Sequence, residues 1–391
     1  MNYEFPQMQV SVIIVNYKVK YYLAQCLHSV TQALREVEGD IYVVDNDSQD
    51  DSIDFCRQLF PDVHYILNPH NTGFAHANNL AIRQSRGRYV MLLNPDTIIN
   101  EHLIADCIQL LDSAPTIGAT GVRMLNSDGT FAPESRRGTP TPFVAACKML
   151  GLTRLFPTSH LFGRYYMKYL DEFTATPIDI ISGACMFIRR TTIEQCGLLD
   201  EDFFMYGEDI DLSYRMLLTR QHNYYLPTRL LHYKGESTHK NSYHYVYVFY
   251  NAMDIFFRKH YSSYSWLITI PIRTAIYLKG AQEYLSRKTR QLFAKPYSPL
   301  ANLQSGRVLV KASNHTVEDI IDILDRNAIT YDLTENPTIR YSHVVYDTTS
   351  HTYEAILSDL ERRAKHPDTR THIATYSPQH HAIITQEIVL T

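Results

Sequence analysis

The sequence predicts an α/β fold: a Rossmann-like, mostly parallel central sheet, then C-terminal helices and a small additional α/β domain. Three observations support this. Within the first hundred residues, short apolar runs typical of strands alternate with segments whose apolar residues recur at helical spacing. Such alternation implies βαβ crossovers and therefore parallel strands. With 391 residues the chain is too long for one typical domain, and the alternation resumes near the C-terminus.

The first predicted strand covers residues 10–15, where "VSVIIV" is the continuous β-branched run expected of a strand buried on both faces. Three more strands follow in the same region, at 40–45, 63–67 and 88–93. The helices predicted between them cover residues 21–37, 52–60 and 73–85.

In the middle of the chain, the regular alternation of strands and helices is interrupted. Strands are predicted at 117–125 and 178–190, and helices at 208–220 and 241–261. Between them, residues 139–176 are rich in Pro, Gly, Phe and Tyr without clean periodicity, which predicts a long functional loop or a small helical insert.

We expect three parts: a catalytic domain over 1–262, an amphipathic helical segment and linker over 263–305, and a small α/β domain over 306–391. Residues 263–295 are apolar at first, interrupted by Pro271 and Arg273, and then basic. This suits an in-plane helix on an anionic membrane surface, and equally a helix packed on the first domain. The last part carries no readable motif, and a partner-binding or dimerising role is the default expectation.

Composition excludes several classes of protein. A formal net charge of −4 gives no sign of the basic surface that nucleic-acid binding needs. The six cysteines lie between Cys26 and Cys196 without metal-type spacing, as expected of reduced thiols in a cytoplasmic protein. The start of the sequence lacks the features of a signal peptide, and no window is long and apolar enough to span a membrane. We therefore expect a cytoplasmic protein whose membrane contact, if it has one, is peripheral, on the inner face of the cytoplasmic membrane. Homo-oligomerisation stays open.

Polar residues follow each of the first four predicted strands directly. They are Asn16 and Tyr17, then the stretches 45–51, 68–74 and 94–97. Ligands of open parallel sheets bind beyond the carboxyl ends of the strands. Each loop alone could be polar for solvation only, but four such loops at one rim predict a binding site.

Asp96 stands at the end of the apolar run "RYVMLLNPDT". A carboxylate at this position suits a hard cation, Mg²⁺ or Mn²⁺, which completes its shell with water and phosphate oxygens. The alternative is that Asp96 caps a helix beginning with the next residues.

Two later stretches add candidates. In "FFMYGEDIDLSYR", Glu208 and Asp209 open a helix, where the dipole alone would favour acidic residues. The preceding aromatic residues would also raise a carboxyl pKa and suit it to general-base work. In "LLHYKGEST", His232 is either structural or a further ligand of a metal held by Asp96.

Seven stretches now resemble one family in order and spacing. They are "VSVIIVNYK", "VVDNDSQDDS", "NTGFAHANNLAI", "LLNPDT", "SGACMFIRR", "DEDFFMYGEDIDLSYR" and "HYKGES". Together they resemble the family 2 glycosyltransferases, and most closely the inverting, rhamnosyltransferase-like branch that extends bacterial polysaccharides. The resemblance covers roughly residues 9–260.

The resemblance implies a GT-A fold, a divalent metal (Mg²⁺ or Mn²⁺) and a nucleotide-diphosphate sugar donor of the dTDP or UDP type. Its acceptor would be a glycan or a lipid-linked glycan. The implied nucleotide-sugar site comprises Asn16, Tyr17, Asp45, Asn71, Gly73, Asn79, Asn94 and Asp96. Asp209 matches the catalytic base, with Ser182, Gly183 and Glu208 near the acceptor, while Asp96 and His232 match metal ligands. Asn94 replaces the first Asp of the family's D-x-D motif, and one carboxylate fewer weakens a hard-cation site.

Two other functions were weighed. A sugar nucleotidyltransferase should carry a Gly-rich phosphate loop after its first strand, but "NYKVKYYLAQC" contains no glycine. A non-catalytic sugar-nucleotide sensor would not need the Glu208–Asp209 pair, because binding alone requires no base.

Overall fold

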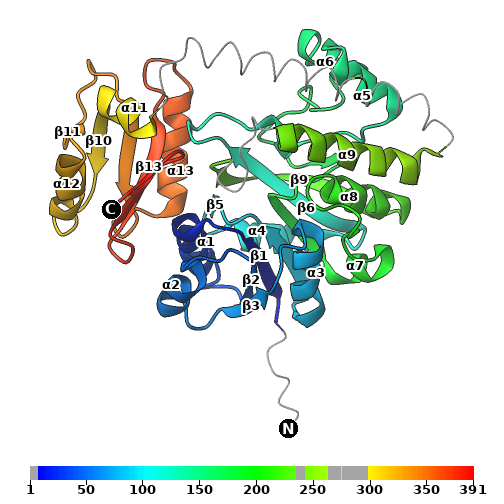
Figure 1. The fold of residues 1–391 in the computed structure, drawn as a ribbon. Helices are drawn as coiled ribbons and strands as arrows, with labels where there is room; N and C mark the ends of the chain where they lie inside the picture. The colour runs from blue at the N-terminus through cyan, green and yellow to red at the C-terminus, as the bar shows by residue number, and fades with distance from the viewer. Residues whose placement is uncertain (1–7, 235–242, 263–273, 275–297) are drawn as a thin grey trace.

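The computed structural model describes residues 8–234, 243–262, 274 and 298–391. Within these residues two α/β units lie side by side, one coloured blue to green and the other yellow to red (Figure 1). The first is built on a nine-stranded sheet and the second on a six-stranded sheet. The predicted fold class is therefore confirmed. The three domain boundaries stay predictions, because most of the segment between 263 and 297 lies outside the described residues.

The first sheet has the strand order β3-β2-β1-β4-β8-β6-β9-β5, and β7 pairs with β9. Its parallel half comprises β1 (Val10–Asn16), β2 (Gly39–Asn46), β3 (His64–Asn68) and β4 (Tyr89–Leu93). Its other half comprises β5 (Thr97–Ile99), β6 (Ile117–Leu125), β7 (Thr176–Ile178), β8 (Cys185–Arg189) and β9 (His222–His232). The direction changes where β8 runs antiparallel to β4.

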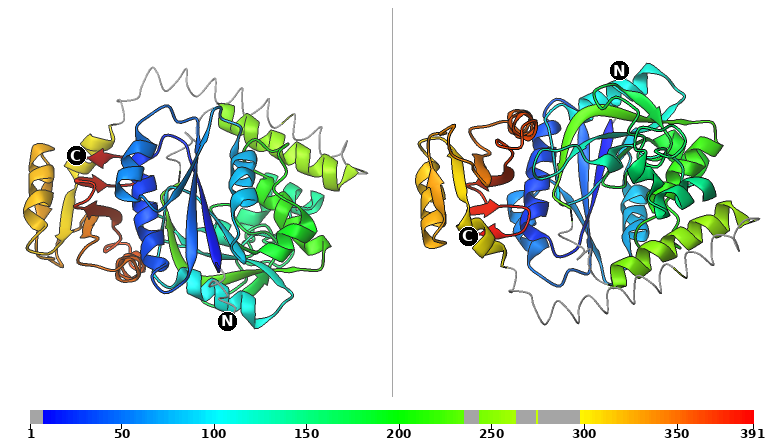
Figure 2. Two further views of the ribbon diagram at one scale, coloured as in Figure 1. Left: turned by 90° about the horizontal axis from the view of Figure 1, so that it is seen from below. Right: turned by 90° about the horizontal axis from the view of Figure 1, so that it is seen from above.

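Helices cover both faces of the parallel strands, which explains their unbroken apolar sequences. Val12 and Ile14 pack with the helices of one face, while Ile13 and Val15 point to the other. The first face carries α1 (Lys20–Ala33), α2 (Ser52–Leu59) and α4 (Leu103–Ser113). The second carries α3 (Phe74–Gln84), α7 (Arg190–Cys196) and α8 (Glu208–Leu218). Figure 2 shows the blue strands between these two helical layers.

Two local predictions need correction. The helix after Asp96 begins only at Leu103, because strand β5 comes first, so Asp96 is not a helix cap. The strand predicted over 178–190 is divided, because Ile178 ends β7 and a loop separates it from β8. The insert predicted near 139–176 contains the short helices α5 (Pro142–Met149) and α6 (Leu152–Leu155). Helix α9 (Tyr243–His260) follows β9 in the described chain.

The second unit has the strand order β11-β10-β12-β13-β14-β15. Its strands are β10 (Arg307–Lys311), β11 (Thr330–Asp332), β12 (His343–Asp347), β13 (His372–Ser377), β14 (Ala382–Ile384) and β15 (Val389–Leu390). Its helices are α11 (Pro299–Ser305), α12 (Val317–Arg326) and α13 (Tyr353–Ala364). None of the helices in the described parts of the chain is long and apolar enough to cross a membrane.

The two units share a continuous interface. Glu101 of the first unit accepts hydrogen bonds from the backbone N–H groups of Tyr353 and Glu354, at 2.7 and 2.9 Å. Its carboxylate thus satisfies the exposed N–H groups at the start of α13. Apolar side chains of both units, including Tyr22 and Leu360, form one buried cluster. The second unit is therefore packed on the first through its core as well as its polar groups.

Glu361 of α13 joins two cations of the first unit. Its carboxylate lies 2.9 Å from Arg123 and 2.7 Å from Arg229, and both Glu361 and Arg123 are buried. In the Glu361→Ala variant, Arg123 keeps only one ion pair among the described residues, the one with Glu172. Removing one partner of a buried pair leaves a poorly compensated charge, so we expect a loss of about 3 kcal/mol in the free energy of unfolding.

Urea denaturation measures this loss, with Glu318→Ala on the exposed side of α12 as the matched control. Equal stability of the two variants would contradict the role assigned to Glu361.

Candidate active site

A pocket of about 560 Å³ lies at the carboxyl ends of β1, β2 and β4. Most of the predicted site residues line it, namely Tyr17, Asn71, Gly73, Asn94, Asp96, Ser182, Gly183, Glu208, Asp209 and His232. An apolar wall of Phe204, Met205, Tyr206, Val248 and Phe249 completes it. The loop after β7, the start of α8 and the end of β9 thus converge on the rim that the four strand ends predicted.

Three predicted residues lie behind the pocket lining. Asn16 is fully buried and donates hydrogen bonds to Asp45 Oδ1 at 2.8 Å and to Ser48 Oγ at 3.0 Å. Asn79 donates to the carbonyl of Leu199 at 2.9 Å and accepts from its N–H at 3.2 Å. These contacts hold the rim loops in place. Direct contact of Asn16, Asp45 and Asn79 with a nucleotide stays a prediction.

Asn46, which lies within the predicted polar stretch 45–51, shapes the side of the pocket next to β2. Its Nδ2 donates to Asn71 Oδ1 at 3.0 Å, and its Oδ1 accepts from Asn68 Nδ2 at 2.9 Å. Gly73 follows with φ of 85°, and an added Cβ would lie 2.4 Å from the carbonyl oxygen of Phe204. A side chain would therefore break the close approach between this loop and the apolar wall.

Strand pairing brings Asp96 and His232 together. In the antiparallel pair β5–β9, His232 lies opposite Thr97, and the N–H of Tyr233 donates to the carbonyl of Asp96 at 3.0 Å. As a result His232 Nε2 lies 3.3 Å from Asp96 Oδ1 and 3.4 Å from Asn94 Nδ2. Asp96 is only 2% exposed, yet it lines the pocket.

This arrangement fits a hard divalent cation. Mg²⁺ binds through one or two carboxylates and keeps waters and substrate phosphate oxygens in its shell. Asp96 and His232 supply two donors on one side of a pocket wide enough for the remaining ligands. Across the described chain, no cluster of three or more acidic, His or Cys side chains has the spacing of a metal site. A cation at this site would therefore take most of its ligands from water and from the bound substrate.

Asp209 enters the pocket from the first turn of α8. Its Oδ2 accepts a hydrogen bond from the N–H of Gly183 at 2.9 Å and forms an ion pair with the Arg137 guanidinium. Arg137 also donates to the carbonyl of Ile181 at 2.9 Å. Burial lowers the pKa of Arg137, but the charge of Asp209 and its hydrogen bond, together with the charges of Tyr165 and Glu134, hold that pKa above its ordinary value. Asp209 thus sits in a fixed orientation beside a permanent cation.

Glu208, the neighbour of Asp209, is held in the opposite state. It is 5% exposed, and burial followed by the charge of Asp209 raises its pKa to about 8. Glu208 therefore carries a proton near neutral pH. Its neighbour Asp209 faces the Arg137 guanidinium.

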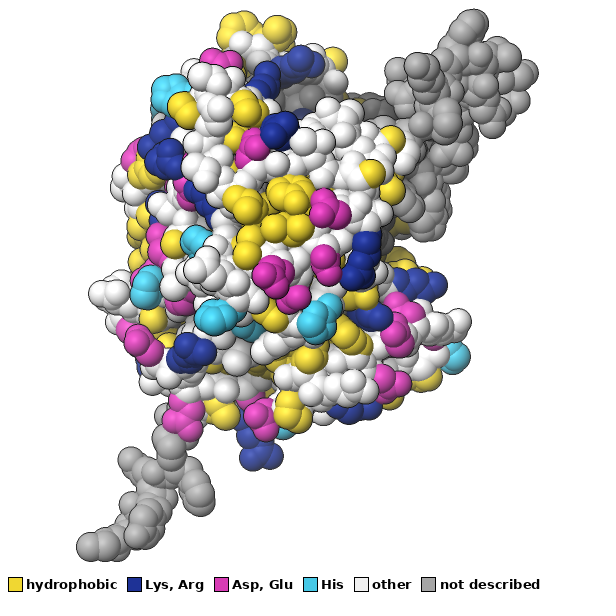
Figure 3. Space-filling view, turned by 90° about the vertical axis from the view of Figure 1, so that its left-hand side faces the viewer, with side chains coloured by type: hydrophobic (Ala, Val, Ile, Leu, Met, Phe, Trp, Pro, Cys, Tyr) yellow, Lys and Arg dark blue, Asp and Glu magenta, His cyan; other side chains and the backbone are white. Residues whose placement is uncertain are grey.

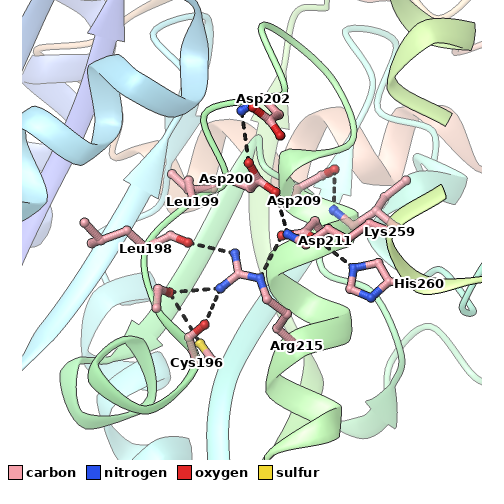
Figure 4. A network of polar contacts seen from close by, with 12 residues as sticks. Cys196, Leu198, Leu199, Asp200, Asp202, Asp209, Asp211, Arg215, Lys259 and His260 are labelled. Atoms are coloured by element: carbon pink, nitrogen blue, oxygen red, sulfur yellow. Dashed lines mark hydrogen bonds and ion pairs between the residues drawn. The ribbon is translucent and has the colours of Figure 1, made fainter. Parts of the chain in front are cut away.

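Asp211, the third acidic residue of this turn, is an anchor outside the pocket (Figure 4). Its carboxylate is fully buried and bonds Arg215 Nε at 2.7 Å, His260 Nε2 at 2.7 Å and Lys259 Nζ at 2.9 Å. Burial would raise the pKa of Asp211, but these donors lower it to about 2. Arg215 also bonds the carbonyl groups of Cys196 and Leu198. The network ties α8 to α9 and to the loop after α7, and so fixes where Asp209 lies.

The buried proton of Glu208 has a consequence for stability. Because its pKa in the folded chain is raised above the value of an unfolded glutamate, folding favours the protonated form. Its contribution is fully present below about pH 4.5 and is lost as the pH rises through about 8. We therefore expect the free energy of unfolding to fall more steeply between about pH 5 and about pH 8 in the wild type than in Glu208→Gln.

Denaturation with urea at several pH values gives both slopes. Parallel curves for the two proteins would show that Glu208 is ionised in the folded chain.

Three charged residues of the pocket were not predicted. Arg137 pairs with Asp209, while Lys234 Nζ lies 2.5 Å from Glu134 Oε1. Although burial raises the pKa of Glu134, Lys234 lowers it below its ordinary value overall. The sequence signals were the run "PESRRG", which contains Glu134 and Arg137, and the stretch "HYKGES", which contains Lys234.

Part of this chain is similar to known proteins. Residues 11–197 match the description of glycosyl transferase family 2. The low-salt glycan biosynthesis hexosyltransferase Agl10 of Haloferax volcanii is 32% identical over 211 residues, which are 52% of this chain and 60% of that protein. An N-acetylglucosaminyl-diphospho-decaprenol L-rhamnosyltransferase of Mycobacterium tuberculosis is 27% identical over 239 residues, which are 58% of this chain and 76% of that protein.

A solved structure, the mannosyltransferase PcManGT from Pyrobaculum calidifontis in complex with GDP-Man and Mn²⁺, is 15% identical with a TM-score of 0.44. The similarity covers 76% of this chain and 78% of that one.

Residues 11–197, which lie in the first unit, match glycosyl transferase family 2, and this unit is an α/β fold built on a nine-stranded mixed sheet. Over these residues, the resemblance to the family noted in the sequence is confirmed. The matched residues run from β1 to α7 and include the whole parallel half of the sheet. The chain spans 60% of the length of the Haloferax relative.

Proposed function

We propose that this protein is an inverting, metal-dependent glycosyltransferase. It moves a sugar from a nucleotide-diphosphate sugar, of the dTDP or UDP type, to a hydroxyl of a glycan or lipid-linked glycan acceptor. The product is a cell-surface polysaccharide. One observation carries the proposal: Asp209 and the Asp96–His232 pair line the same pocket in a family 2 chain. Two relatives, a hexosyltransferase and an N-acetylglucosaminyl-diphospho-decaprenol L-rhamnosyltransferase, support the reaction class.

The donor side of the reaction is served by the strand ends. The Asn46–Asn71 loop shapes the side of the pocket where the nucleoside binds, and Asp96 with His232 faces the diphosphate. A divalent cation bound there would neutralise the negative charge that collects on the diphosphate as the sugar bond breaks. Asn94 adds an amide beside this pair, without a second charge.

The acceptor side is served by α8. Asp209 accepts the proton from the attacking hydroxyl, because it lines the pocket beside the Arg137 guanidinium, whereas burial raises the pKa of Glu208. Gly183 and Arg137 keep its carboxylate aimed at the pocket. A single attack from the face opposite the diphosphate inverts the anomeric carbon. No covalent sugar–enzyme intermediate is required.

A screen for donor hydrolysis tests the proposal without knowledge of the acceptor. The purified chain is incubated with a panel of nucleotide sugars, with Mn²⁺ or Mg²⁺ and with EDTA, and released nucleoside diphosphate is measured. We expect release from one donor, and its loss with EDTA. Release that survives EDTA would contradict metal dependence. Nucleotide binding without release, even with a range of glycan acceptors added, would favour a sugar-nucleotide sensor.

A further inference from the structure

The helical insert presents an unusual surface. Six large apolar side chains are exposed between residues 143 and 161, namely Phe143, Met149, Leu150, Leu155, Phe156 and Leu161. We call this set the α5–α6 surface. It contains more than half of the exposed large hydrophobic side chains among the described residues. Leu150 and Leu155 are 74% and 70% exposed. Clusters of this kind mark interaction sites more often than scattered single residues do.

The α5–α6 surface belongs to a well-anchored element. Thr141 caps α5 by accepting a hydrogen bond from the N–H of Val144 at 3.3 Å, and Val144 itself is buried. Ala145 packs against the apolar cluster of α8 and α9, and the Lys148 amine lies 3.5 Å from the centre of the Tyr165 ring. Helix α5 is therefore apolar on two sides, one buried against the body and one uncovered. In Figure 1 both helices lie at the upper edge of the molecule, beyond α9.

The charged residues within the insert itself are all of one sign. Residues 136–170 contain six Lys or Arg residues and no Asp or Glu, although the whole chain has a net charge of −4. Arg154, Arg164 and Lys168 are exposed. Arg164 lies 3.7 Å from Asp179, whereas Arg154 and Lys168 form no ion pair with any described residue. By contrast, acidic, basic and apolar side chains are interspersed on the face shown in Figure 3.

We propose that the α5–α6 surface docks on an anionic lipid bilayer. Exposed Leu and Phe side chains among unpaired Lys and Arg are the pattern by which peripheral helices enter the headgroup region. The apolar side chains would enter the boundary between headgroups and acyl chains, and the cations would meet anionic headgroups. A purely apolar partner would not explain the missing acidic residues. The proposal concerns the insert alone and does not depend on the membrane contact predicted for residues 263–295, which lie largely outside the described chain.

The docking surface is linked to the pocket. Lys148 of α5 lies 5.7 Å from the centre of the Phe249 ring, and Phe249 lines the pocket. Arg137, at the start of the same basic stretch, reaches Asp209. A bilayer held by the α5–α6 surface would therefore lie near the apolar wall of the active site. If the proposed function is right, a lipid-linked acceptor would approach along this wall.

Vesicle co-sedimentation tests the docking independently of catalysis. The full chain is spun with vesicles of phosphatidylcholine alone or mixed with phosphatidylglycerol. We expect sedimentation with the anionic vesicles only, weakened by salt because the cations are exposed. Leu150→Glu combined with Leu155→Glu should lower the partition coefficient at least tenfold. Arg154→Gln should lower it by roughly fivefold, the usual share of one basic residue near an anionic surface.

Leu218→Glu is the matched control, since Leu218 is 62% exposed at the end of α8, outside the α5–α6 surface. It should bind vesicles like the wild type. Circular dichroism and the rate of donor hydrolysis confirm that each variant is folded. Absence of wild-type binding, or equal binding by the Leu150/Leu155 variant, would overturn the proposal. So would a wild-type dimer that the same variant converts to a monomer, because the surface would then be covered by a second copy.

Discussion

The Asp209→Asn variant is expected to lose roughly 10²- to 10⁴-fold in kcat, while its KM for the donor stays near the wild-type value. The proposed role of Asp209 is to accept a proton, and the amide of Asn cannot do so at neutral pH. The donor diphosphate is assigned to Asp96 and His232 on another wall of the pocket, so donor binding should survive. Steady-state measurements of nucleoside diphosphate release give both constants.

Two controls separate chemistry from folding. Asp54→Asn changes an 81% exposed carboxylate on α2 and should leave both constants unchanged. The free energy of unfolding of Asp209→Asn shows how much stability the chain loses when Arg137 loses its ion-pair partner. A kcat within a few-fold of the wild type would exclude Asp209 as the base.

The Asp96→Ala variant is expected to lose the metal-dependent part of the activity, roughly a thousandfold in kcat. Asp96 is the single carboxylate at the proposed cation site, since Asn94 takes the place of a second one. Without Asp96, only His232 would remain as a donor from the chain. Titration of activity with Mn²⁺ should show saturation for the wild type and no saturable dependence for the variant.

Asp54→Ala is the matched control for this change as well. An Asp96→Ala variant with an unchanged Mn²⁺ response would move the cation elsewhere in the pocket. Full activity of the wild type in EDTA would remove the cation from the account.

The sequence predicted those parts of the site that depend on local pattern. An apolar run in the sequence predicts each parallel strand. The residue at the carboxyl end of each strand must lie at the common rim of the sheet. Asp96 follows this logic, and so does the convergence of Tyr17 and Asn71 on the same pocket. Glu208 and Asp209 could be placed at the start of α8 because a glycine and apolar aromatic residues precede them.

Contacts between residues far apart in the chain could not be predicted from the sequence. Nothing near Asp96 in the chain shows that β5 pairs with β9, yet this pairing sets the 3.3 Å separation of Asp96 and His232. Arg137 reaches Asp209 across 72 positions of sequence, from a stretch without periodicity. Local propensity carries no information about such contacts.

The packing between the two units was also beyond sequence reasoning. Glu101 reads as an ordinary acidic residue ahead of α4, but its carboxylate binds the first turn of α13, more than two hundred residues away. The ion pairs of Arg123 and Arg229 with Glu361 could not be predicted either, because Glu361 lies in the second unit.

The central claim is that one pocket holds the donor through Asp96 and takes the acceptor proton through Asp209. Calorimetric titration of nucleoside diphosphate, with and without Mn²⁺, tests it most directly when paired with turnover of the same proteins. We predict that Asp209→Asn binds the nucleotide like the wild type but does not turn over donor. Asp96→Ala should lose the Mn²⁺-dependent gain in affinity. If Asp209→Asn lost nucleotide binding, or if Asp96→Ala kept the full Mn²⁺ effect, the assignment of the two roles would be wrong.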